Sequence, residues 1–396
     1  MNIVKRIRRL YRAGTYVRLR AAHTLLQPAA RMLYRKKHIW IISERGTDAR
    51  DNGFYLFRYI RKNHSQQQVY YIIDRKSADY SKVAALGNVV QRGSLKHWML
   101  YLGAEVKISS HLNGFIPGDS WQYFLFASRR RKNDKNVFLQ HGVTKDDLKN
   151  CYRNCTNINL FICGAKPEYD YILSRYGYSE KELKYTGFAR FDSLHDTIVR
   201  RQVLIMPTWR SWLSTHLDGV TQQDVENSMF LKKWAAVIQS KRLRELAKKY
   251  NISFVFYPHY EVQPYLNLFG KSDEYVTIAD FASFDVQRLL KESMLLITDY
   301  SSVFFDFAYM QKPTLYYQFD EDEYRAHHYA QGYFDYRRDG FGEVVTEEAD
   351  LFVLLEQYLK NSCRLKPEYQ QRIQGFFPLH DKKNCERIYQ EIKNLS

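Results

Sequence analysis

The stretch LLITDYSSVFFDFAYMQKPTLYY, Leu295–Tyr317, joins an apolar strand to an apolar helix through a short polar junction. The run LLIT is typical of a buried parallel strand, and PTLYYQF at 313–319 reads as the next strand. Asp299, Ser301 and Ser302 occupy the junction between the first strand and the helix. A strand–helix–strand unit of this kind predicts a parallel α/β sheet.

The junction has the residues expected of a phosphate-binding site. Ser301 or Asp299 can cap the helix, which is expected from about Ser302 to Met310. A helix start also presents unpaired backbone N–H groups and the positive end of its dipole. Two hydroxyls beside those groups favour phosphate oxygens. The chain contains neither GxxxxGK[ST] nor GxGxxG, so the predicted site is neither a P-loop nor a dinucleotide fingerprint.

The same alternation of strands and helices extends over most of the chain. In the first half, strands are expected at 38–43, 69–74, 105–110, 136–140 and 159–164, and helices at 51–63, 93–104 and 166–177. In the second half, strands are expected at 202–209, 253–259, 275–279 and 295–298, and helices at 230–249, 284–293, 347–360 and 381–394. The pattern predicts two Rossmann-like domains facing across a cleft, 38–200 and 201–396 with closing helices.

Reactive or anion-binding residues follow several of these strands. Ligands of open parallel sheets bind beyond the carboxyl ends of the strands, so these positions are the ones that predict a site. They are His141 after VFLQ, Thr208 and Arg210 after QVLIMP, His259 after FVFYP, and Asp299, Ser301 and Ser302 after LLIT. Each residue alone is compatible with a structural role, but together they predict one interdomain site.

Positive charge is concentrated at the N-terminus. The formal net charge is +17, and residues 1–37 contain eleven Lys and Arg and no acid. Apolar residues recur there with helical spacing, which predicts a basic amphipathic helix over much of 1–37. Such a helix favours an anionic membrane surface, and the alternative is a solvated helix packed on its own protein. The membrane-binding cations are expected to be Lys5, Arg6, Arg8, Arg9 and Arg12.

Several classes of protein are disfavoured by what the sequence lacks. No apolar stretch approaches the roughly 18–20 residues of a membrane span, and no signal peptide is recognisable. Five scattered cysteines argue for free thiols in a cytoplasmic protein, although Cys151 and Cys155 could instead be metal ligands. The neighbouring His327 and His328 are a second, weak metal candidate. No metal site is predicted.

At this point the sequence resembles the CDP-glycerol glycerophosphotransferases, which are the teichoic-acid primases and polymerases and include capsule-polymer relatives. The motifs QHGVTKDDL, TGFARFDSL, MPTWR, YPHY and LLITDYSSVFFDFAYMQKP occur in the family's order, followed by HHYAQGYFDYRRDGFGEVV. The resemblance extends from about residue 40 to the C-terminus. It implies a GT-B fold, a CDP-polyol donor and a membrane-bound, lipid-linked acceptor.

The resemblance also implies roles for individual residues. The histidine of the family's His-Gly motif, here His141, acts as base, and the histidine after the proline corresponds to His259. The serine pair corresponds to Ser301 and Ser302. This chain departs from the family in reading His-Gly-Val-Thr for His-Gly-Thr-Pro and Pro-His-Tyr for Pro-His-Pro, and in lacking a Pro-Gly-Pro after Tyr336.

The predicted function is transfer of a polyol phosphate, with glycerol phosphate favoured over ribitol phosphate, from a CDP-polyol to a lipid-linked hydroxyl. CMP is released, and the product is a phosphodiester of teichoic acid or a capsule polymer. The donor diphosphate is expected on Arg210, Thr208, Asp299, Ser301 and Ser302, with His141 and His259 as catalytic residues. No cofactor is firmly implied beyond the CDP-polyol co-substrate, and the sequence leaves a divalent-metal requirement open. The enzyme is expected at the cytoplasmic face of the membrane.

Two other functions fit parts of the pattern. A GT-B glycosyltransferase using a nucleotide sugar would keep the fold and change the chemistry. A non-enzymatic membrane- or nucleic-acid-binding protein would account for the charge. Clustering of that charge in residues 1–37 and the lack of an RNA-binding motif argue against nucleic acid as a partner.

Overall fold

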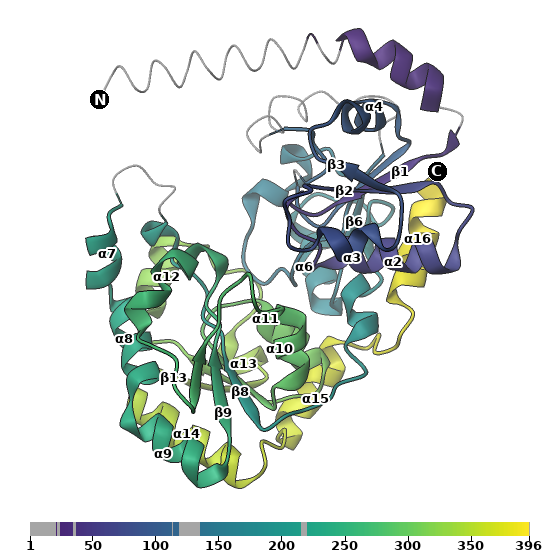
Figure 1. The fold of residues 1–396 in the computed structure, drawn as a ribbon. Helices are drawn as coiled ribbons and strands as arrows, with labels where there is room; N and C mark the ends of the chain where they lie inside the picture. The colour runs from purple at the N-terminus through teal and green to yellow at the C-terminus, as the bar shows by residue number, and fades with distance from the viewer. Residues whose placement is uncertain are drawn as a thin grey trace.

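Two lobes make up the molecule, and each is built on its own parallel sheet (Figure 1). The computed structural model describes residues 21, 24–34, 37–112, 114–118, 135–214 and 220–395. Within these ranges every strand pairing in both sheets is parallel. The predicted pair of α/β units is therefore confirmed.

The first sheet has seven strands in the order β3-β2-β1-β4-β5-β6-β7. Its strands are β1 (Trp40–Ser43), β2 (Val69–Ile73), β3 (Val89–Gln91), β4 (Val106–Ser109), β5 (Lys135–Phe138), β6 (Leu160–Cys163) and β7 (Leu183–Tyr185). Its helices include α2 (Asn52–Asn63), α3 (Tyr80–Ala84), α4 (Leu95–Gly103), α6 (Lys166–Arg175) and the 3₁₀ turn η4 (Ala189–Ser193). The short strands β3 and β7 were not predicted.

The second sheet has six strands in the order β10-β9-β8-β11-β12-β13. Its strands are β8 (Gln202–Ile205), β9 (Ser253–Phe256), β10 (Val276–Ile278), β11 (Leu295–Thr298), β12 (Thr314–Tyr317) and β13 (Gly342–Val345). Its helices include α7 (Gln222–Asn227), α8 (Met229–Gln239), α9 (Lys241–Tyr250), α10 (Val286–Glu292), α11 (Val303–Tyr309), α12 (Glu321–His327), α13 (Tyr336–Asp339), α14 (Glu348–Lys360) and α15 (Pro367–Phe376).

Both sheets reverse their strand order beside their first strand. In the first sheet β1 lies between β2 and β4, and in the second β8 lies between β9 and β11. A reversal of this kind leaves a crevice at the carboxyl ends of the two central strands, because the connections leave in opposite directions. The fold therefore offers two ligand crevices, one in each lobe.

The predicted helix at 230–249 is two helices. Ser240 has an extended backbone, with φ −60° and ψ 135°, and its hydroxyl accepts a hydrogen bond from the backbone N–H of Arg242. Serine competes with helix continuation in this way because its side chain can replace the helical carbonyl as acceptor. α8 consequently ends at Gln239 and α9 begins at Lys241.

The chain returns to the first lobe at its C-terminal end. Helix α16 (Asn384–Leu395) packs against α2 and η4, and it lies beside α2 in Figure 1. The ring of Tyr389 stacks on His64 at 3.8 Å between centroids and contacts Trp40 at 5.4 Å. Because of these contacts, we assign α16 to the first unit, although the sequence suggests that it closes the second.

The two lobes share one continuous apolar core. That core runs from Trp40 and Leu139 of the first lobe to Phe304 and Tyr316 of the second. A buried ion pair also crosses between the lobes, since Arg190 of η4 donates two hydrogen bonds of 2.7 Å to Asp306 of α11. The sequence motifs TGFARF and SSVFFDF therefore meet in space.

Most of the predicted basic segment, including Lys5, Arg6, Arg8, Arg9 and Arg12, lies outside the described residues. Residues 24–34 are helical, and this helix packs on α4. A Cβ on Gly103 of α4 would lie 2.6 Å from the carbonyl oxygen of Ala30, so glycine permits the close approach. In the described ranges no helix has the length and apolar character needed to span a bilayer.

Candidate active site

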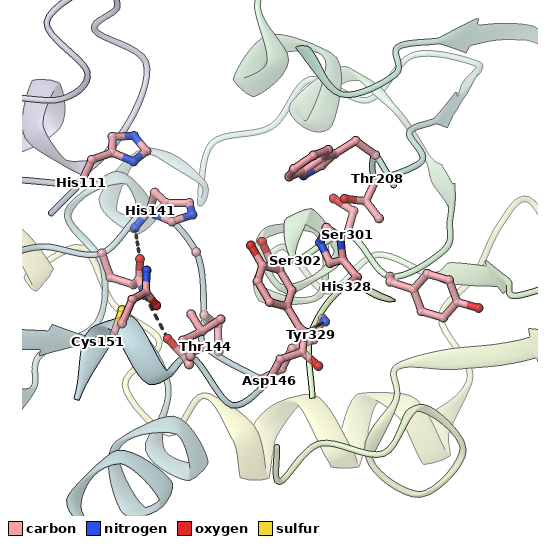
Figure 2. A pocket seen from close by; sticks show the side chains of 18 of the residues that line it. His111, His141, Thr144, Asp146, Cys151, Thr208, Ser301, Ser302, His328 and Tyr329 are labelled. Carbon is pink, nitrogen blue, oxygen red and sulfur yellow. Dashed lines mark hydrogen bonds and ion pairs between the residues drawn. The ribbon is translucent and has the colours of Figure 1, made fainter. Parts of the chain in front are cut away.

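A cavity of about 420 Å³ lies where the two strand-reversal crevices face each other. This volume is in the range of small-molecule sites. Figure 2 shows its two walls: His111, His141 and Thr144 come from the first lobe, and Thr208, Ser301, Ser302 and His328 come from the second. Five of the seven residues predicted as catalytic or phosphate-binding line it, namely His141, Thr208, His259, Ser301 and Ser302.

The backbone that presents His141 is held in an unusual conformation. Gln140 follows β5 with a backbone φ of 55°. This value lies in the left-handed region, which residues other than glycine, Asn and Asp rarely adopt. Its side-chain oxygen accepts from the backbone N–H of His141 at 2.8 Å, and its amide donates to Thr144 Oγ1 at 3.0 Å. Asn52 of α2 donates to the Gln140 carbonyl at 2.6 Å. Strain of this kind persists where the surroundings fix it, as at many functional sites.

Gly142 brings the two walls together. A Cβ at this position would lie 2.7 Å from Ser302 Oγ and 3.3 Å from Ser302 Cβ, so any larger residue would displace the serine hydroxyl. The His-Gly motif after β5 and the serine pair before α11 therefore lie close together across the interlobe cavity. A glycine after His141 thus leaves room for the Ser302 hydroxyl at the cavity.

His141 is arranged to accept a proton. The Ser110 backbone raises the pKa of His141, which is the effect of a carbonyl acceptor, and we infer that the ring nitrogen facing it carries the hydrogen. The other nitrogen keeps its lone pair. His141 is exposed on the cavity side, so its desolvation is partial; this desolvation and the positive charges of Arg45 and Arg190 lower its pKa, and the Ser110 backbone opposes them. The ring is therefore neutral at pH 7, which a general base requires.

A second imidazole, which was not predicted from the sequence, packs on the first. The ring of His111 stacks on that of His141 with centroids 4.7 Å apart and an interplanar angle of 24°. Burial, together with His141 and Arg45, holds the pKa of His111 well below its usual range. His111 follows β4, so a search of every strand end would have found it.

His259 presents the opposite hydrogen-bonding character. Its Nδ1 accepts a hydrogen bond of 3.3 Å from the backbone N–H of Glu261, so the neutral ring carries its hydrogen on Nε2. Burial lowers the pKa of His259 to about 3, with Arg45, His141 and His328 acting in the same direction. His259 is thus a neutral hydrogen-bond donor, suited to a phosphate oxygen.

The serine pair is the other anion-binding element of this wall. Ser302 is the N-cap residue of α11, and its side chain makes no capping hydrogen bond. Ser301 Oγ lies 3.5 Å from the backbone nitrogen of Val303, at the limit of a hydrogen bond. The predicted capping role is therefore weak in this structure, and both hydroxyls line the cavity and can bind a ligand.

Arg210 and Asp299 do not line the cavity. Arg210 is only 1% exposed and forms ion pairs with Asp299 at 2.9 Å and Asp320 at 2.8 Å. Asp299 also accepts hydrogen bonds from the backbone N–H groups of Thr208 and Tyr300. This geometry does not support the predicted direct contact with phosphate. Both residues instead lie behind the wall and fix the loop that carries Thr208.

These buried charges stabilise one another. Burial lowers the pKa of Arg210, but the carboxylates of Asp299 and Asp320 outweigh it and raise that pKa overall. The pKa of Asp299 is raised by burial, with the Arg210 charge opposing this effect. The arrangement is a structural ion cluster, because none of its three side chains is accessible to a ligand.

Lys145, Asp146 and Arg325 link the lobes at the floor of the cavity. Asp146 pairs with its neighbour Lys145 and with Arg325 of α12, the latter at 2.7 Å. Burial lowers the pKa of Lys145, while Asp146 opposes that shift. Lys145 lines the cavity and was not predicted from the sequence, where it is one lysine in a charged run.

The described residues contain no group of three or more His, Cys, Asp or Glu side chains placed to hold a metal ion. All five cysteines are free, and Cys151 and Cys155 are not joined by a further ligand pair. His327 and His328 are not a metal pair in this part of the chain: His328 lines the cavity, whereas the ring of His327 contacts Trp212.

A family model described as CDP-glycerol:poly(glycerophosphate) glycerophosphotransferase matches residues 25–394. The minor teichoic acid biosynthesis protein GgaB of Bacillus subtilis is 34% identical over 92% of the chain and 40% of its own length. The teichoic acid poly(glycerol phosphate) polymerase of B. subtilis is 25% identical over 96% of the chain and 51% of its length. The chain thus spans about half the length of these curated relatives.

The solved structure of the wall teichoic acid polymerase TagF covers 100% of this chain and 99% of its own, with a TM-score of 0.66 and 17% identity. At this identity the likeness shows the fold, and it confirms the predicted GT-B-like arrangement. Other solved forms of that polymerase carry a substituted histidine, and two of those were soaked with CDPG.

Proposed function

The chain belongs to the CDP-glycerol:poly(glycerophosphate) glycerophosphotransferase family, and from this premise we propose that its interlobe cavity transfers a polyol phosphate from a CDP-polyol to an acceptor hydroxyl. One observation carries the proposal. A neutral imidazole with a free lone pair, His141, faces a wall of neutral donors, His259, Ser301 and Ser302, across one cavity.

The reaction is an in-line displacement at the phosphorus that bears the polyol. The acceptor oxygen forms a new bond to this phosphorus, and the bond from the phosphorus to the oxygen shared with CMP breaks. The acceptor proton passes to the unprotonated nitrogen of His141, and CMP leaves with the bonding electrons. Such reactions depend on positioning and charge stabilisation more than on covalent catalysis.

The second-lobe wall would hold the diphosphate. The Nε2–H of His259 and the hydroxyls of Thr208, Ser301 and Ser302 offer hydrogen bonds to oxygens whose charge grows as CMP leaves. Arg210 and Asp299 act as positioning residues, because they fix the Thr208 loop without reaching the cavity. Arg45 lies close enough to lower the pKa of three histidines and adds a long-range positive charge.

The donor is proposed to be CDP-glycerol or CDP-ribitol, and the acceptor a lipid-linked polyol phosphate or saccharide. A donor panel tests the reaction: CMP release is followed with CDP-glycerol, CDP-ribitol and UDP- and GDP-sugars, each with and without a lipid-linked primer. We expect primer-dependent CMP release from one CDP-polyol. Turnover of a nucleotide sugar alone would instead support a glycosyltransferase and overturn the proposal.

We further propose that the N-terminal segment associates with the anionic inner surface of the membrane, where such an acceptor would lie. The helix at 24–34 supports this, since Leu25, Met32 and Leu33 are 77%, 81% and 47% exposed. Leu95, at the start of α4 on which this helix packs, is 65% exposed. Apolar side chains beside a basic segment are typical of an interfacial anchor.

Vesicle binding tests the membrane proposal. Replacing Leu25, Met32 and Leu33 by Ser should abolish sedimentation with anionic vesicles while turnover of a soluble acceptor analogue is retained. Removal of residues 1–20 should weaken binding in the same assay by deleting the predicted cations. Unchanged sedimentation of both variants would exclude this segment as the anchor.

A further inference from the structure

His328 lines the same cavity, and neither its sequence context nor the family motifs assign it a role in the reaction. It follows the last residue of α12, and its ring stacks on Tyr324 of that helix at 4.7 Å between centroids. In Figure 2 it lies with Ser301 and Ser302 on the second-lobe wall, opposite His111 and His141.

The protein fixes which nitrogen of His328 carries the hydrogen. The backbone N–H of Ser211 donates to Nδ1 at 3.2 Å, and the Ser211 hydroxyl donates to the His327 carbonyl at 2.7 Å. These two bonds join the loop after β8 to the end of α12. Because Nδ1 acts as acceptor, the neutral ring has its hydrogen on Nε2, which makes no hydrogen bond to any of the described residues.

The surroundings keep this ring neutral. Burial lowers the pKa of His328 to about 3, and the nearby charges of Arg210, Lys145 and Arg325 act in the same direction, while Asp146 opposes them. The ring is therefore a hydrogen-bond donor without a charge of its own at physiological pH. A histidine that binds a metal ion needs a free lone pair, and in the neutral His328 the lone pair of Nδ1 already accepts from Ser211.

His259, which also contacts Trp209, shows the same arrangement. In both histidines Nδ1 accepts a hydrogen bond from a backbone N–H. The donor is Glu261 for His259 and Ser211 for His328. The indole of Trp209 contacts both rings, with centroids 5.9 Å from His259 and 5.2 Å from His328. The repeated geometry makes a paired set of neutral donors beside Ser301 and Ser302.

We propose that His328 is a second diphosphate-binding histidine, whose Nε2–H donates to an oxygen of the donor's diphosphate together with that of His259. The inference rests on the proposed function of the cavity and extends it by one substrate-contacting residue. A hydrogen bond to a charged oxygen stabilises binding by about 1.5–3 kcal/mol, so its loss corresponds to roughly a 10- to 100-fold weaker affinity.

Two substitutions separate the roles of the two ring nitrogens. In His328→Asn the amide oxygen can still accept from the Ser211 N–H, but nothing replaces Nε2–H. In His328→Gln the side-chain amide reaches the position of Nε2 and can still donate. Titration calorimetry with CDP and with cytidine should show at least tenfold weaker CDP binding for His328→Asn, less than fivefold for His328→Gln, and unchanged cytidine binding for both.

The neighbouring His327→Asn is the matched control, because its ring contacts Trp212 and does not line the cavity. CDP affinity within twofold of wild type is expected for it, and thermal unfolding midpoints should agree among the three variants. Normal CDP affinity of a folded His328→Asn would overturn the inference. An equal loss of CDP and cytidine affinity would also overturn it, since it would indicate a change of shape. Failure of the wild-type protein to bind CDP at all would instead refute the proposed function.

Discussion

The two walls of the cavity use the same side chain in opposite ways. On the first-lobe wall, the Ser110 backbone favours a hydrogen on the nearer ring nitrogen of His141, which leaves the lone pair of the other nitrogen for the cavity. On the second-lobe wall, His259 and His328 accept backbone N–H groups and keep a hydrogen for the cavity. The backbone partner therefore decides whether a cavity-lining imidazole serves as a base or as an anion binder.

The largest expected effect is on turnover, and it comes from removing the proposed base on the first-lobe wall. His141→Ala removes the only lone-pair imidazole proposed as base, so CMP release should fall by about 100-fold or more. The exposed His38→Ala, whose ring pairs with Glu105 on the surface, is the control and should turn over normally. If His141→Ala retained more than a tenth of wild-type turnover, His141 would not be the general base.

The second-lobe wall should depend on the ion cluster behind it for its shape. Arg210→Met leaves Asp299 and Asp320 buried without a positive partner, which costs about 3–5 kcal/mol of stability in comparable buried pairs. Urea unfolding measures this loss, and the exposed Arg338→Met should differ from wild type by less than about 0.5 kcal/mol. If Arg210→Met kept full stability but lost affinity for the donor, the original prediction that Arg210 binds the phosphate directly would be supported instead.

Much of this arrangement could be predicted from the sequence, because strand ends are local features. The apolar runs and the turns after them placed His141, Thr208, His259, Ser301 and Ser302 at one edge of two sheets. Burial of Arg210 and Asp299 was not predictable, since the partner that makes it possible, Asp320, lies beyond the next strand. His328 stands at the end of a short helix, so no strand end pointed to it.

Prediction of the fold has the same limit: elements marked by local sequence were predictable, and contacts between residues far apart in the chain were not. The long alternating segments were predicted, whereas the short strands β3, β7 and β13 lack the length or apolar character of a recognisable strand. The return of α16 to the first lobe depends on Tyr389 meeting His64 and Trp40, which lie more than three hundred residues earlier in the chain. Helical spacing alone cannot specify such a partner.

Neutral histidines on both walls predict a sensitivity to acid. Their pKa values in the folded protein lie below the ordinary value of about 6.5, so the unfolded chain binds protons first as the pH falls. Stability should be complete above pH 6.5 and decrease toward pH 4, by at most about 1.4 kcal/mol per pH unit for each of the half-buried rings of His259 and His328, and by less for the exposed ring of His141. His259→Asn should reduce the loss between pH 6.5 and 5 by about 2 kcal/mol in urea unfolding. An unchanged pH dependence in that variant would show that His259 titrates normally.

The smallest effect is expected from a single hydroxyl of the second-lobe wall. Ser302→Ala removes one donor that makes no capping hydrogen bond, so the helix should remain while CDP-glycerol affinity falls about five- to tenfold. Ser283→Ala, at an exposed turn outside the cavity, is the matched control. Equal calorimetric affinities of Ser302→Ala and wild type for CDP-glycerol would show that this hydroxyl does not bind the phosphate.

One measurement tests the division of the two walls most directly: the dissociation constant of CDP for His141→Asn and His259→Asn, determined by calorimetry under the same conditions. Binding within twofold of wild type is predicted for His141→Asn, and binding at least tenfold weaker for His259→Asn. Loss of CDP affinity in His141→Asn with normal affinity in His259→Asn would contradict the assignment of base and anion binder to opposite walls.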